Sequence, residues 1–290
     1  MFLQVLISSL VIGSCYGLIA LGYSLIYKSS GLMSFVQGDM LTLGAFLGYT
    51  LYGLFHVPFF LSLAIVSIGM FFVGMLIEKG IIRRLQNKNV MAIYIVLATI
   101  ALSYIIQNGA MFAWGTEMKA FPRVFSTTSI HILGRDIQSE SIFCIFVGLA
   151  VMGILHVFMN FTSVGIAMRA AAMDPMAARA CGVDGSLMVG LSWGLSAGIA
   201  AIAGMLIGPV YGVYTTLGAT IGRKGFSSAV IGGYGNMIGA ILGGLLLGIV
   251  ETFTAAYISS AYKDLIAYTL LIVFLFAIPT GLTNERAIVD

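Results

Sequence analysis

The chain has 290 residues, of which 60% are hydrophobic and only 9% are charged. This composition excludes a soluble globular domain, which could not bury so much apolar surface at this length, and indicates an integral membrane protein. The formal net charge of +3 is small and is spread over the polar intervals, which argues against a nucleic-acid partner. Three cysteines, two of them inside apolar runs, argue against a disulfide framework.

The first apolar run, from about Val5 to Tyr27, is expected to be the first membrane helix. It has neither a basic start nor a convincing cleavage site, so we expect it to be retained with its N-terminus outside the cell. Gly13 and Gly17 lie four residues apart and therefore share one face, where small residues allow another helix to approach closely.

The second apolar run, from Phe35 to about Phe55, begins with polar groups at Gln37 and Asp39. An acid inside a membrane is costly unless it is paired or hydrated, so Asp39 is a candidate functional residue. The alternative is that Asp39 caps the helix near the membrane surface, where the helix dipole favours a carboxylate.

The third run, from about Phe59 to Ile77, leads into the strongest basic cluster of the chain, which is expected to face the cytoplasm. This cluster contains Arg83 and Arg84. A fourth run, from about Val90 to Trp114, carries two further polar candidates, Gln107 and Asn108.

The polar interval 115–141 has balanced charges and is predicted to be an external loop. Apolar and polar residues alternate on either side of Gly134, which predicts a small β-hairpin. His131 is expected to be a solvated strand residue, because no second ligand has the spacing that a metal site requires. We therefore predict no metal site.

A fifth run, from about Ile142 to Met159, returns the chain to the cytoplasmic side and to the interval 162–185. Here Asp174, Pro175 and Gly182 have the residue types of an N-cap, a first helical position and a left-handed C-terminal position. They predict a short helix with Arg169 before it and Arg179 inside it, presented to another protein. The alternative is an amphipathic helix at the lipid headgroups, which its alanine-rich face does not favour.

The last three runs extend from about Leu187 to Ile207, from Phe226 to about Val250, and from about Leu265 to Ile278. We interpret 211–224 as an external connection, although Arg223 and Lys224 on that side contradict the charge rule. Breaks at Gly232-Gly233 and Gly235-Asn236 predict a discontinuous or re-entrant segment. Glycines at four-residue spacing predict close helix packing at Gly194, Gly198, Gly235, Gly239 and Gly243.

The predicted fold is therefore an all-α polytopic membrane protein with about eight transmembrane helices, some of them discontinuous or re-entrant, in a single domain over 1–290. The first two runs loosely resemble the sixth and seventh runs in the opposite orientation. Such inverted repeats recur among transporters. Chance similarity between glycine-rich apolar segments is the alternative explanation.

Several kinds of catalytic chemistry are missing from the sequence. No lysine follows a glycine, so there is no GxxxxGK[ST] phosphate loop, and neither HExxH nor GxSxG occurs. We therefore expect no enzyme activity and no cofactor in this chain, and any energy for transport is expected to come from a separate subunit.

Three segments together resemble a known family: YGLIALGYSLIYKSSGLMSFVQGDMLTLGAF, RAAAMDPMAARACGV and GFSSAVIGGYGNMIGAILGGLLLGIVE. In this order they resemble the permease subunits of branched-chain amino acid (LivH/LivM-type) ABC importers, and the LivH type more closely. The resemblance implies a bacterial inner-membrane location. It also implies three kinds of partner besides membrane lipid: a LivM-type second permease, two cytoplasmic ATPases that bind ATP, and an external or periplasmic solute-binding protein.

The resemblance also suggests site residues. Residues 162–185 match the cytoplasmic coupling loop that contacts the ATPase, although the usual Glu of that loop is replaced by Arg169 or Ala170. Gln37, Gly38 and Asp39 match a second segment of the family, in which Val36 stands where Ala is usual. The coupling candidates are Arg169, Ala171, Ala172, Asp174, Pro175, Arg179 and Gly182. The translocation pathway candidates are chosen from the residues themselves, as polar groups in or beside apolar runs: Gln37, Asp39, Gln107, Asn108 and Asn236.

The competing function is a stand-alone channel or facilitator for a small neutral solute such as urea or an amide. Glycine-rich broken helices suit such a protein equally well. A facilitator, however, has no need for a capped helix that projects from the cytoplasmic face.

Overall fold

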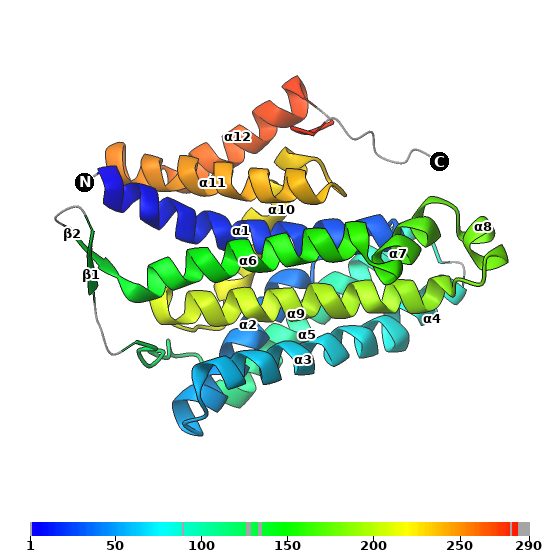
Figure 1. Ribbon diagram of the computed structural model, residues 1–290, viewed down its shortest axis with the longest axis horizontal. Helices are drawn as coiled ribbons and strands as arrows, with labels where there is room; N and C mark the ends of the chain where they lie inside the picture. The colour runs from blue at the N-terminus through cyan, green and yellow to red at the C-terminus, as the bar shows by residue number, and fades with distance from the viewer. Residues whose placement is uncertain (1, 89, 126–128, 133–134, 279, 284–290) are drawn as a thin grey trace.

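A computed structural model of the protein describes residues 2–88, 90–125, 129–132, 135–278 and 280–283. The chain is a bundle of long helices whose axes lie roughly along one direction (Figure 1). The first half contains α1 (Phe2–Ser30), α2 (Gln37–Gly48), the π-helical η1 (Tyr49–Leu54), α3 (Phe59–Ile77), the π-helical η2 (Glu78–Ile82), α4 (Arg83–Asn87) and α5 (Ala92–Trp114).

The second half begins with β1 (Ser129–Ile132) and β2 (Arg135–Gln138), which pair antiparallel and confirm the predicted hairpin. The helices that follow are α6 (Ser139–Phe161), α7 (Ser163–Met173), α8 (Pro175–Ala180), α9 (Gly185–Tyr211), α10 (Leu217–Gly232), α11 (Met237–Tyr257) and α12 (Lys263–Ala277).

Six helices in the described part are long and apolar enough to cross a membrane: α1, the continuous α3–η2–α4 segment, α5, α6, α9 and α11. Helices α2, α10 and α12 are shorter. The polytopic all-α prediction is confirmed, whereas the predicted number of about eight spans is not. The difference arises because an apolar window does not distinguish a helix that starts inside the bundle from one that crosses it.

The helices α2 and α10 both begin inside the bundle, because the chain reaches each of them through a short non-helical segment. Residues 31–36 lead into α2, and residues 212–216 lead into α10. Gln37, at the start of α2, donates to the Ser196 carbonyl of α9 at 2.8 Å, so α2 begins beside the middle of a long helix.

Helices α2 and α10 cross close to their first turns. The Gly218 amide of α10 donates to Thr42 Oγ1 of α2 at 2.8 Å, and both groups are buried. A Cβ atom on Gly218 would overlap the Gly38 carbonyl oxygen, and one on Gly222 would lie 2.8 Å from the Gly38 Cα. Only glycine permits backbones to approach this closely.

The packing has the pattern of an inverted repeat. Helix α1 packs on α11 as α9 packs on α3, α10 packs on α1 as α2 packs on α9, and α5 packs on α2 as α12 packs on α10. If α1, α2, α3 and α5 are exchanged with α9, α10, α11 and α12, respectively, each of these helix contacts is converted into another one of the set. Helix α1 starts at the end that carries the N-terminus, and α9 starts at the opposite end beside α8 (Figure 1).

Two expectations about the seventh run are corrected, and one is confirmed. The segment 226–250 is two helices, because α10 ends at Gly232 and α11 starts at Met237. The predicted breaks are confirmed: Gly233 and Gly235 have φ of 107° and 100°, a left-handed range open to glycine. Gly235 thus lies in a turn and not in a helix-packing ladder.

The predicted external connection 211–224 was also wrong in its second part, because α10 is helical from Leu217 onward. Lys224 is only 4% exposed and sits inside the bundle. It forms ion pairs with Glu251 of α11 and with Asp264 of α12, the latter at 2.7 Å. The positive charge that contradicted the charge rule is therefore neutralised by partners within the protein.

The remaining predicted packing glycines lie at helix contacts. Gly13 of α1 lies against the backbone of α11 at Leu245, and Gly17 lies against Met152 of α6. Gly194 and Gly198 of α9 face α3, and Gly239 and Gly243 of α11 face the backbone of α10.

Candidate functional site

A cleft of about 430 Å³ lies over the crossing of α2 and α10, between α5 and α12. Its volume falls in the range of small-molecule sites, which is roughly 300–1,000 Å³. The wall contains apolar and aromatic groups, one acid, one base and several hydroxyls: Tyr23, Phe35, Gly38, Asp39, Ile100, Ser103, Tyr104, Gln107, Gly218, Ala219, Gly222, Arg223, Phe226, Ser227, Tyr268 and Leu271.

Asp39 is the acid of this cleft. It lies in the first turn of α2, is 2% exposed, and accepts a short hydrogen bond at Oδ2 from the Ser103 hydroxyl of α5. Its Oδ1 is buried and has no hydrogen-bond partner in the part of the chain that the structure describes. The N-cap of α2 is Val36, and Asp39 lies in the first turn, where the helix dipole favours a carboxylate.

Arg223 is the base of the cleft, on the α10 side of the crossing. Asp39 follows Gly38 in α2, and Arg223 follows Gly222 in α10, at the point where these two glycines meet. Within the described residues the Arg223 guanidinium makes no hydrogen bond or ion pair, in contrast to the neighbouring Lys224.

The other predicted pathway residues are distributed differently. Gln107 lines the cleft with Asp39. Gln37 is 2% exposed and is held by Ser196, whose hydroxyl donates to Gln37 Oε1 at 2.8 Å.

Asn108 donates to the Tyr104 carbonyl on the exposed face of α5. Asn236 caps α11 by accepting from the Gly239 amide at 3.1 Å, and it lines a separate pocket with Lys28 and Arg169.

A second candidate site is the segment α7–α8 at the end of the bundle opposite the hairpin, where α8 projects beyond the long helices (Figure 1). The predicted short helix is confirmed. Asp174 is its N-cap and accepts from the Met176 and Ala177 amides at 2.9 Å, and Pro175 is its first residue. Gly182 follows it with a φ of 82°.

The surface of this segment combines apolar and basic groups. Met173 and Met176 are 82% and 83% exposed, and Arg179 is exposed on α8. Ala171 of α7 is buried against the bundle, Ala172 is half-buried, and Arg169 lies beside Lys28 of α1 in a pocket. The exposed methionines therefore face away from the protein.

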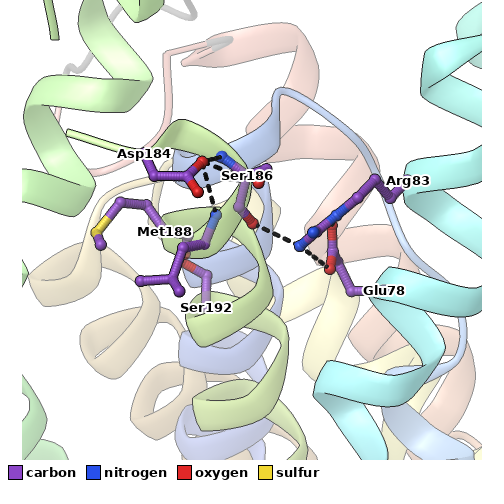
Figure 2. Close-up of polar contacts among 7 residues, drawn as sticks. Glu78, Arg83, Asp184, Ser186, Met188 and Ser192 are labelled. Atoms are coloured by element: carbon purple, nitrogen blue, oxygen red, sulfur yellow. Dashed lines mark hydrogen bonds and ion pairs between the residues drawn. The ribbon is translucent and has the colours of Figure 1, made fainter. Parts of the chain in front are cut away.

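Figure 2 shows how the chain after α8 is anchored. The Arg83 guanidinium donates to both carboxylate oxygens of Glu78, at 3.0 and 2.7 Å, and to the Ser186 carbonyl of α9 at 2.8 Å. Asp184 caps α9 by accepting from the Ser186 amide at 2.9 Å. Hydrogen bonds from the Ser186 hydroxyl and from backbone amides lower the pKa of Asp184, so the cap is a carboxylate at neutral pH.

We expect Arg83→Gln to destabilise this end of the protein, because Glu78 is 1% exposed and would lose its charged partner. An unsatisfied buried polar group costs about 1–3 kcal/mol. A lower thermal unfolding midpoint in detergent would show the loss. Arg84→Gln, an exposed neighbour with the same chemical change, is the matched control and should leave the midpoint unchanged.

Two residues of the cleft, Ser103 and Arg223, could not be recognised from the sequence pattern. Ser103 had no distinguishing pattern, because a serine in an apolar helix is common and its contact with Asp39 depends on the packing of α5 against α2. Arg223 was assigned to a connection. The conflict of Arg223 and Lys224 with the charge rule was the signal that could have moved both into the bundle.

The family model described as "Branched-chain amino acid transport system / permease component" matches residues 5–275. The chain is 33% identical to the high-affinity branched-chain amino acid transport system permease protein BraD of Pseudomonas aeruginosa, over 98% of this chain and 96% of BraD. It is 31% identical to the LivH permease protein of Escherichia coli K12, with the same coverage. A probable LivH of Methanocaldococcus jannaschii is 28% identical, over 97% of this chain and 92% of the relative.

Proposed function

The chain belongs to the permease-component family of branched-chain amino acid transport systems, and on this premise we propose that it is a LivH-type subunit of an ATP-binding-cassette importer. It is a multi-pass membrane protein and a transport subunit, not an enzyme. In this proposal it moves branched-chain amino acids or a related small polar solute into the cell across the bacterial inner membrane, with its N-terminus outside.

The proposed partners follow from the same premise. A LivM-type permease pairs with this chain, two cytoplasmic ATPase subunits bind and hydrolyse ATP, and an external or periplasmic protein delivers the solute. This chain needs no cofactor and hydrolyses no nucleotide, which accords with the missing phosphate loop in its sequence.

The observation that carries the proposal is the projecting segment α7–α8. A helix of six residues is marginal alone, so its two caps and its alanines specify its shape. The segment α7–α8 also leaves the side chains of Met173 and Met176 82% and 83% exposed. Flexible apolar side chains with a nearby base, here Arg179, suit a protein partner.

A rigid path joins this segment to the cleft. Helix α8 leads through Asp184 into α9, whose Ser196 carbonyl and hydroxyl hold Gln37 at the start of α2. Further along α9, Gly204 lies so close to the Leu41 carbonyl of α2 that a Cβ atom would overlap it. A movement of α9 therefore moves α2 and Asp39 with it. In this way the ATP-driven closure of the ATPase subunits is transmitted to the cleft.

The test is co-purification of the ATPase subunits with the tagged permease from a membrane extract in mild detergent. Met176→Glu places a charge on the exposed face of α8 and should reduce the recovered ATPase at least tenfold. Gly182→Pro should have the same effect, because proline cannot adopt a φ of 82° and would remove the amide that donates to the Arg179 carbonyl.

Met118→Glu is the matched control, since Met118 is 61% exposed and lies at the opposite end, in the interval 115–125. It should leave ATPase recovery unchanged. If the wild-type chain purifies alone and conducts solute in liposomes without ATP, the chain is a facilitator and the importer proposal fails.

A further inference from the structure

We propose that the cleft between α5 and α12 binds the backbone of a zwitterionic α-amino acid, with Asp39 taking the ammonium group and Arg223 the carboxylate. The apolar wall would then take an aliphatic side chain. This inference rests on the proposed transport function and deepens it, because it names the groups of this chain that recognise the solute.

The first support is the state of Asp39. Its Oδ2 accepts from Ser103, whereas its Oδ1 is buried, faces no donor among the described residues and belongs to a residue that lines the cleft. A buried acceptor without a partner is costly, and an acid at this position in a membrane protein calls for a cationic or protonated partner. An ammonium group in the cleft supplies both a charge and a donor.

The second support is the position of Arg223. The glycines that precede Asp39 and Arg223 are in backbone contact, so the acid and the base flank one crossing point and line one cleft. An arginine offers a fork of donors that matches a carboxylate. The ammonium and carboxylate groups of an α-amino acid have opposite signs and share one carbon, so a single cleft lined by an acid and a base offers a partner to each of them.

The third support is the remaining wall. Phe35 and Phe226 lie with ring centroids 5.4 Å apart, and Phe226 contacts Tyr23 edge-on at 5.7 Å. Ile100 of α5 and Leu271 of α12 complete an apolar surface within the same cleft. An aliphatic side chain is stabilised there by removal of its surface from water, whereas a second charged group is not.

A purely structural role for Arg223 is the competing explanation, because Arg223 also acts electrostatically on Asp264. Asp264 already has Lys224 as a partner at 2.7 Å. The two roles differ in one respect. A structural residue affects every ligand equally, whereas a carboxylate-binding residue affects only ligands that carry a carboxylate.

The experiment measures binding of tritiated leucine to the complex of both permeases and the ATPases in nanodiscs, without the binding protein. Leucinamide, which lacks the carboxylate charge, and 4-methylpentanoate, which lacks the ammonium, serve as competitors. We expect wild type to prefer leucine over each analogue by at least tenfold. Arg223→Gln should abolish the preference over leucinamide, and Asp39→Asn should abolish the preference over 4-methylpentanoate.

Arg84→Gln and Glu117→Gln are the charge-matched controls, since both residues are exposed and lie outside the cleft. They should preserve both preferences. The inference is overturned if wild type binds leucine and leucinamide equally, or if each cleft variant weakens all three ligands by the same factor. Neither result affects ATPase co-purification, so failure of this inference is distinguishable from failure of the importer proposal.

Discussion

Gly218→Ala is expected to abolish the folded protein, because the added methyl group would overlap the Gly38 carbonyl oxygen and the Thr42 hydroxyl. Ordinary overpacking of a core costs about 1–3 kcal/mol, since side chains can shift. Here the obstacle is the backbone of a neighbouring helix, so the cost exceeds that range. Recovery of monodisperse protein by size-exclusion chromatography, together with the thermal unfolding midpoint, measures the loss.

Two other helical glycines provide matched controls. A Cβ atom on Gly109 of α5 or on Gly153 of α6 would meet nothing within 4 Å. Gly109→Ala and Gly153→Ala should therefore be tolerated, and each should gain about 0.5–1 kcal/mol because alanine favours a helix over glycine. Equal midpoints for Gly218→Ala and Gly109→Ala would show that α2 and α10 do not cross in backbone contact.

Lys224→Met is expected to be the most destabilising change of a single charge. It leaves Glu251, a residue 4% exposed, with the Tyr16 hydroxyl at 2.8 Å as its remaining donor. Breaking a buried ion pair by removing one partner costs about 3–5 kcal/mol. The midpoint of thermal unfolding in detergent is the measurement.

Substitutions of the three residues in this ion-pair cluster should lower the unfolding midpoint by different amounts, in a fixed order. Glu251→Gln should cost less than Lys224→Met, because Lys224 keeps Asp264, and Asp264→Asn should cost least, because that side chain is 55% exposed. The double change Lys224→Met with Glu251→Leu should be more stable than Lys224→Met alone, since no buried unpaired charge remains and the carboxylate of Asp264 is exposed. A double variant as unstable as the sum of its single changes would contradict the pairing.

Local rules allowed the sequence to predict the features that depend on neighbouring residues. Asp174, Pro175 and Gly182 specified the short helix, because caps act within one or two turns. Gly233 and Gly235 marked the break between α10 and α11 for the same reason, since a left-handed φ belongs to a single residue.

Features that depend on distant partners could not be predicted in this way. Lys224 looked like a loop residue because its partner Glu251 lies in another helix, and a hydropathy window assigns the full cost of a charge to an unpaired lysine. The start of α10 at Leu217 was missed for the same reason, because the predicted connection extended to Lys224. Gln37 was predicted to line the translocation pathway, and its side-chain amide is hydrogen-bonded to Ser196 of α9.

The contact between Gly38 and Gly218 has a mechanical consequence. The backbones of the two helices touch there, and the Gly218 amide is bonded to the Thr42 hydroxyl, so the contact resists sliding of α10 along α2. Because α1 also packs on α11 and α3 on α9, the two halves of the protein are interlocked at more than this crossing. Asp39 and Arg223 follow the glycines of the crossing, so a movement of α9 that carries α2 moves both residues together.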